Sequence, residues 1–117
     1  MHDPYLTRIT NIKDKPDFAT KFETRVYGGK NKTDWWTDTF TLNELRQLGI
    51  KQAQAPGRIS RFDFKFTFPT LDDVIEMVIA FNQQHKGKRN PDGRLAGILI
   101  EAKDSQMYRD IYGLEIG

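Results

Sequence analysis

Residues 95–105 read LAGILIEAKDS, an aliphatic run that ends in a carboxylate and an ammonium group two positions apart. Such a run is typical of a strand buried on both faces, as in a parallel sheet covered by helices. Because side chains at positions i and i+2 of a strand point to the same face, Glu101 and Lys103 would stand together where the predicted strand 95–101 ends. The two charges therefore form either an ion pair at a strand terminus or part of a site.

The segment before this run carries the signals of a helix. Residues 69–87 read PTLDDVIEMVIAFNQQHKG, with Thr70 placed to cap a helix and Asp73 at the capping-box position. Apolar residues then recur at helical spacing, which predicts a helix over 71–85. A further short helix is predicted over 107–112, and the order helix, buried strand, helix is what a parallel α/β sheet produces. The site of such a sheet lies beyond the C-terminal ends of its strands.

The segments nearer the N-terminus are patterned less uniformly. The stretch TLNELRQLG, 41–49, has Thr and Glu at capping-box spacing and predicts a short amphipathic helix that stops at Gly49. In RFDFKFTF, 61–68, phenylalanine occupies every second position, which predicts a strand or an extended loop lining the core. Residues 1–40 show no sustained period, so we expect loops there, with at most one short helix near 17–23.

Length and composition limit the classes of function. The 117 residues suffice for one domain, whereas a complete (β/α)8 barrel needs roughly 250. The 18 basic residues barely exceed the 16 acidic ones, for a formal net charge of +2, so a nucleic-acid partner is not implied. No apolar run approaches the ~20 residues of a membrane span. The chain has no cysteine, which excludes disulfides and thiolate metal sites, while compartment and oligomeric state stay open.

Four stretches of the sequence, in this order, resemble the glycerophosphodiester phosphodiesterase family. They are HDPYLTRIT at 2–10, FTLNEL at 40–45, FPTLDDV at 68–74 and ILIEAK at 98–103. The resemblance implies a TIM-barrel enzyme. Such an enzyme hydrolyses a small glycerophosphodiester, for example glycerophosphocholine, to glycerol 3-phosphate and an alcohol, with the help of a divalent metal ion.

The resemblance also implies roles for three residues. His2 matches the second of two family histidines that act as general acid and base, and imidazole titrates near neutral pH. Glu101 matches a carboxylate that helps to hold Mg²⁺ or Ca²⁺, both of which prefer oxygen ligands. Lys103 matches a lysine that would stabilise charge on the phosphate. From the residues alone, the alternatives are a histidine in a frayed terminus and an ion pair at a strand end.

Parts of the family pattern have no match here. Its histidine-arginine-glycine stretch and its first acidic strand would precede this sequence, and its later strands would follow it. We therefore expect an internal fragment of a partial TIM barrel, truncated at both ends and inactive alone, with a loop-rich insertion over 1–40 and the helix and strand portion over 41–117. The alternative is a non-catalytic binding module, in which Trp35 and Trp36 contact a partner instead of packing over a sheet edge.

Overall fold

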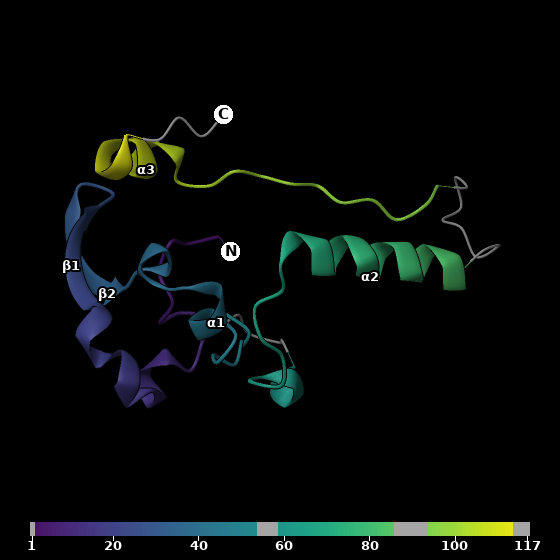
Figure 1. Ribbon diagram of the computed structural model, residues 1–117, viewed down its shortest axis with the longest axis horizontal. Helices are drawn as coiled ribbons and strands as arrows, with labels where there is room; N and C mark the ends of the chain where they lie inside the picture. The colour runs from purple at the N-terminus through teal and green to yellow at the C-terminus, as the bar shows by residue number, and fades with distance from the viewer. Residues whose placement is uncertain (1, 54–58, 86–93, 114–117) are drawn as a thin grey trace. The chain divides into compact units, whose positions relative to one another are not determined.

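The structure is a computed structural model that describes residues 2–53, 59–85 and 94–113. The chain divides into two compact units, Met1–Phe68 with Ala102–Gly117, and Pro69–Glu101. Among the described residues the elements are one two-stranded sheet, three α-helices and several 3-10 turns (Figure 1). The chain is thus a small mixed α/β structure, and the parallel sheet expected for a TIM barrel is not seen in these residues.

An antiparallel hairpin is the only sheet of the described ranges. Strand β1 (Phe22–Tyr27) pairs with β2 (Lys30–Trp35), in a register that runs from Phe22 opposite Trp35 to Tyr27 opposite Lys30. Gly28 and Gly29 form the turn with φ values of 59° and 75°, the left-handed conformation that a two-residue turn of this type requires. The expectation of loops throughout 1–40 was therefore wrong for these residues.

Short helical segments surround the hairpin in the first unit. They are η1 (Ile12–Asp14), η2 (Pro16–Lys21), η3 (Thr37–Thr39), η4 (Ser60–Phe62), α1 (Leu42–Leu45) and α3 (Ser105–Tyr112). Helix α1 begins with the predicted capping box, in which Thr41 and Glu44 bind each other's backbone amides. The predicted helices near 41–49 and 107–112 are confirmed, and the short helix expected near 17–23 is a 3-10 segment that ends where β1 begins.

The core of the first unit is built from residues far apart in the sequence. Its buried apolar side chains are those of Leu6, Ile12, Phe18, Phe40 and Leu48, and Trp36 is buried as well. Phe18 and Phe40 meet edge to face with ring centroids 5.3 Å apart, the geometry that aromatic pairs prefer. This core fixes the N-terminal loop, because Leu6 lies within it.

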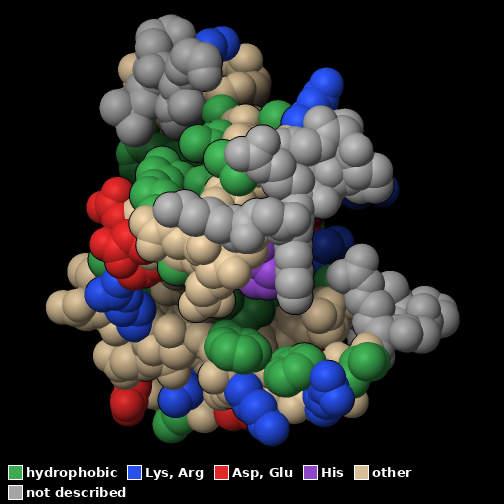
Figure 2. Space-filling view, turned by 90° about the vertical axis from the view of Figure 1, so that its right-hand side faces the viewer, with side chains coloured by type: hydrophobic (Ala, Val, Ile, Leu, Met, Phe, Trp, Pro, Cys, Tyr) green, Lys and Arg blue, Asp and Glu red, His purple; other side chains and the backbone are tan. Residues whose placement is uncertain are grey.

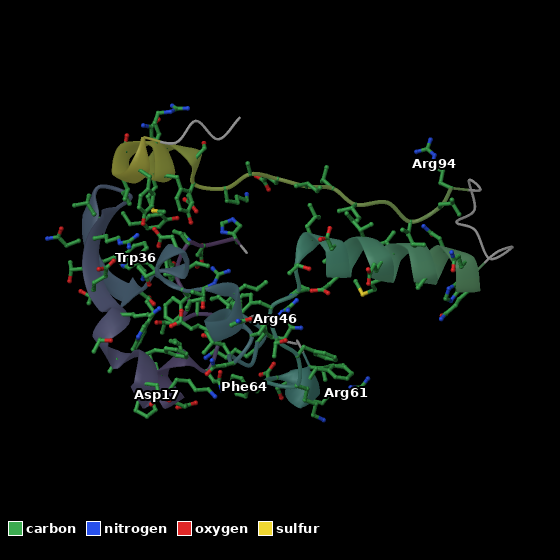
Figure 3. All side chains as sticks on the ribbon, viewed as in Figure 1. Asp17, Trp36, Arg46, Arg61, Phe64 and Arg94 are labelled. Atoms are coloured by element: carbon green, nitrogen blue, oxygen red, sulfur yellow. The ribbon has the colours of Figure 1, made fainter. Side chains whose placement is uncertain are left out.

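The phenylalanine-rich stretch 61–68 does not form the predicted strand or line the core. It contains a 3-10 turn and one isolated bridge, between Ile50 and Phe66. Among its phenylalanines only Phe68 packs partly against the core, and Phe64 (Figure 3) is 49% exposed with a positive φ of 63°. The alternation therefore overstated the strand, because the described structure offers this stretch no partner over its length.

The second unit consists of helix α2 (Leu71–Gln84) and the segment that follows it. The helix starts with the predicted capping box of Thr70 and Asp73, so the helix expected over 71–85 is confirmed. The segment 94–101 is neither strand nor helix, which makes the strand predicted over 95–101 wrong. The amide of Asn82 instead binds both the N–H and the carbonyl of Ala96, at 2.9 Å each.

The apolar side chains of the second unit are largely exposed. Leu99 is 97% exposed, and the apolar stripe of α2 is open at Leu71, Ile75 and Ile79. Apolar side chains are also visible on the molecular face of Figure 2. A strand becomes stable only when neighbouring strands satisfy its backbone and other elements cover its faces. The described residues supply neither to 95–101, which explains why an aliphatic run remains unpaired.

Candidate functional site

The three residues expected to act together are divided between the two units. His2 and Lys103 belong to the first unit, and Glu101 ends the second. Each unit is described by itself, so the convergence of these residues at one sheet edge stays a prediction. The local surroundings of each residue nevertheless limit what it can do.

His2 is held by the residue that follows it. The His2 side chain is 71% exposed, and its Nδ1 lies 2.9 Å from Oδ1 of Asp3. A carboxylate accepts hydrogen bonds, so this contact places the proton on Nδ1 and leaves Nε2 as the imidazole's other site. An imidazole oriented by a carboxylate is suited to proton transfer, because the carboxylate fixes its tautomer and stabilises the imidazolium that forms.

Asp3 is itself fixed by the first unit. Its side chain is only 12% exposed, and its Oδ2 accepts from Nε of Arg8 at 3.1 Å. Burial alone would raise the pKa of the Asp3 carboxyl, but the hydrogen bond from His2 and the charge of Arg8 outweigh it, so this pKa lies below its ordinary 3.8. Burial and the neighbouring Asp3 carboxylate raise the pKa of Tyr5. Asp3 is thus an anion that joins His2 to Arg8.

The rest of the N-terminal motif positions this trio. Leu6 is buried in the core, and the hydroxyl of Thr10 donates to the carbonyl of Leu6 at 2.8 Å and accepts from the amide of Ile12 at 3.2 Å. Asn11 continues the loop by accepting from the amide of Gly49 at 2.8 Å. The motif therefore has a structural part, which folds the loop, and an exposed part, which presents the imidazole. The roles of Asp3 and Arg8 were missed by the sequence reasoning, although both belong to the motif that suggested His2.

Glu101 and Lys103 lie on either side of the boundary between the units. Glu101 is exposed, and Lys103 is partly buried just before α3. The next residue, Asp104, caps α3 with a positive φ of 53° and accepts from the hydroxyl of Tyr27 at 3.1 Å. In the described parts of the chain no group of three or more His, Asp or Glu side chains could hold a metal ion. Glu101 alone is therefore not a complete metal site.

The tryptophan pair is part of the structural framework. Trp36 (Figure 3) is fully buried and donates through its indole to the carbonyl of Glu23 at 3.1 Å. Trp35 is partly buried and donates to the carbonyl of Phe18 at 2.7 Å. Both indoles are therefore satisfied within the first unit, which supports the packing interpretation over contact with a partner.

The largest cavity among the described residues lies between the hairpin turn and α3. Its volume is about 860 Å³, and its walls include Tyr27, Asp104, Met107 and Ile111. Helix α3 is held over the hairpin region by the Tyr112 hydroxyl, which donates to Asp38 at 2.5 Å. None of the three expected site residues lines this cavity. It is separate from the arrangement that the family motifs suggested.

The motifs and the anchored histidine define a class, that of the phosphodiester hydrolases with a glycerophosphodiester substrate, and comparison with known proteins supports this class. Over 78 residues the sequence is 36% identical to glycerophosphodiester phosphodiesterase GDPD6 of Arabidopsis thaliana, covering 67% of this chain and 21% of that protein. The chain is related to part of a glycerophosphodiester phosphodiesterase, and the resemblance to this family is confirmed. No family model and no solved structure matches the chain. No helix of the described ranges is long and apolar enough to cross a membrane.

Proposed function

We propose that this sequence forms part of an enzyme that hydrolyses glycerophosphodiesters to glycerol 3-phosphate and an alcohol. The observation that carries the proposal is the 36% identity to a phosphodiesterase over 78 residues. The contact of His2 with Asp3 at 2.9 Å agrees with it, because this reaction needs an oriented proton-transfer group. The alternative of a non-catalytic module loses its main support with the burial of Trp36.

His2 is assigned to proton transfer. Hydrolysis breaks the bond between phosphorus and the alcohol oxygen while water adds to phosphorus, so one group must accept a proton from water and another must donate one to the leaving oxygen. Nε2 of His2 can exchange a proton with one of these oxygens while Nδ1 stays on Asp3. The other proton-transfer group is not among the residues that the motifs identify in this chain.

Lys103 and Glu101 are assigned to charge. The ammonium group of Lys103 would neutralise the phosphate, whose negative charge increases toward the transition state. Glu101 would be one oxygen donor to a Mg²⁺ or Ca²⁺ ion, and such ions require about six or more ligands. The described residues do not supply that set, so binding of the metal by this chain is expected to be weak, and no chemical step is derived through it.

The proposal is tested by binding to the isotope-labelled 117-residue chain. Glycerophosphocholine is added with Ca²⁺, with Mg²⁺ and without metal, and the amide resonances are followed by NMR. We expect metal-dependent shifts that include His2, Glu101 and Lys103 together, because one bound phosphodiester would contact all three. The variant Glu101→Gln should lose the dependence on metal.

His85 supplies a matched control, because it is the only other histidine in the sequence. It lies at the C-terminal end of α2, where its Nδ1 is 2.8 Å from the carbonyl of Phe81. The variant His85→Gln should bind as the unchanged chain does, whereas His2→Gln should lose the shifts around the N-terminal loop. Shifts that avoid all three assigned residues, or no shifts at millimolar ligand, would contradict the proposal.

A further inference from the structure

The first unit has a second cavity, on the opposite side of Arg8's involvement from Asp3 in chemical terms: this cavity gathers cations. Its volume is about 370 Å³, and its walls include Arg8, Asn11, Lys13, Asp14, Lys51 and Phe64. Neither Glu101 nor Lys103 belongs to it, and neither does His2. It is therefore distinct from the residues assigned to hydrolysis.

The charges around this cavity favour an anion. Three of its side chains are cationic and one, Asp14, is a carboxylate. Arg8 is partly neutralised by Asp3 at 3.1 Å. No ion pair of Lys13 or Lys51 is found within the described ranges. Two lysines without a counter-charge beside one hollow repel each other, and an anion placed between them would relieve that repulsion.

The cavity is held open by backbone bonds between distant segments. The amide of Asn11 donates to the carbonyl of Gly49 at 3.2 Å, and the amide of Lys51 donates to the carbonyl of Ile9 at 2.8 Å. The side-chain oxygen of Asn11 accepts from the amide of Gly49, which leaves the side-chain NH2 of Asn11 as a further donor for a ligand. The positions of the two lysine backbones are thus set before any ligand binds.

Phe64 adds an apolar wall. Its ring is about half exposed, and its backbone is fixed by the bond from its amide to the carbonyl of Ile50 at 2.7 Å. A ring beside a cationic hollow suits a ligand that joins an anionic group to an apolar body. A volume of about 370 Å³ accommodates such a molecule at the small end of ligand-binding pockets.

We propose that this cavity binds a small organic phosphate ester. Its phosphate group would lie between the ammonium groups of Lys13 and Lys51 and accept from the NH2 of Asn11, with the organic part against Phe64. Lysine is suited to phosphate because its ammonium carries three donors on a flexible stem. The inference does not rest on the proposed hydrolysis, since it uses none of the residues assigned to that reaction.

The test measures the binding of inorganic phosphate and phenyl phosphate to the 117-residue chain by calorimetry at fixed ionic strength. The double variant Lys13→Gln/Lys51→Gln should bind phenyl phosphate at least about tenfold more weakly, because each lost charged hydrogen bond is of that order. Lys30→Gln/Lys65→Gln removes the same charge from exposed lysines outside the cavity and should change the affinity less than about twofold. Equal losses in the two double variants would overturn the site in favour of general surface charge.

Three further readouts keep the proposal falsifiable. Lys13→Arg/Lys51→Arg should retain binding, and amide shifts in the unchanged chain should centre on Asn11, Lys51 and Phe64, which decides the matter even if the glutamine variant does not fold. Phenyl phosphate should bind more tightly than inorganic phosphate, and equal affinities would refute the assignment of an organic ligand. His2→Gln should leave the affinity unchanged, so loss of this site and loss of the proposed hydrolysis are distinguishable.

Discussion

Replacing Gly49 by alanine perturbs the contact between two segments of the first unit. Gly49 follows helix α1, and the sequence pattern assigns it to stopping that helix. Its φ is not in the left-handed region, which the structure reserves for Gly28, Gly29 and Gly113 among the described glycines. Glycine is therefore required at position 49 for a different reason, the close approach of Phe64.

The size of the effect follows from the distances. A Cβ atom at Gly49 would lie 2.8 Å from both Cα and Cβ of Phe64 and 3.1 Å from its carbonyl oxygen. Carbon atoms in ordinary contact are about 3.5–4.0 Å apart, so Phe64 must move by roughly 0.7 Å. Its amide is bonded to the carbonyl of Ile50 at 2.7 Å, which opposes that movement. We expect Gly49→Ala to lower the free energy of unfolding by about 1–3 kcal/mol, the range typical of overpacking.

Urea denaturation followed by tryptophan fluorescence measures this change, because both tryptophans belong to the first unit. Gly97→Ala is the control, since a Cβ there meets nothing within 4 Å, and it should leave the unfolding curve unchanged. Phe64→Gly should relieve the clash, so the two changes at 49 and 64 should show a coupling of at least about 0.5 kcal/mol in a double-mutant cycle. A Gly49→Ala chain within about 0.5 kcal/mol of the original would refute the steric argument.

The remaining predictions concern a cap, two titrations and activity. Thr41→Ala removes the capping box of α1 and should cost about 1 kcal/mol in the same urea measurement, whereas Thr41→Ser should cost less. Asp3 has a lowered pKa, so it contributes stability above pH 3.8 that is lost as pH falls through the folded value, and Asp3→Asn should flatten the acid limb of stability against pH. The hydrogen bond to Asp38 raises the pKa of Tyr112 above 10.0, so this stability is present below pH 10 and lost as pH rises through the folded value; Tyr112→Phe should remove that part of the alkaline loss. The 117-residue chain should show no turnover of glycerophosphocholine above background with Mg²⁺ or Ca²⁺, and turnover that disappears in Glu101→Ala would show instead that this chain assembles a complete site.

Much of the candidate site was visible as sequence, but its support was not. The motif at 2–10 identified His2, and the same motif contains Asp3 and Arg8, which anchor it. Their contact could have been suspected from the motif, whereas the burial of Asp3 depends on the fold. The cavity with Lys13 and Lys51 had no local signal, because these residues are 38 positions apart and meet through backbone bonds of the intervening core.

What the sequence alone determined is the local structure. The capping boxes at Thr41 and Thr70 specify helix starts within four residues, so α1 and α2 began where predicted. The two glycines at 28 and 29 carry an equally local turn signal, and recognising it would have identified the hairpin. Such signals need no partner from elsewhere in the chain.

Only the tertiary structure decided which apolar runs are buried and paired. The alternation at 61–68 and the aliphatic run at 95–101 both predicted strands, yet neither forms one. Gly49, assigned to a helix end, is needed for the approach of Phe64. A strand depends on backbone groups of another segment, and close packing depends on the atoms that a distant segment brings, so neither can be read from a single stretch of sequence.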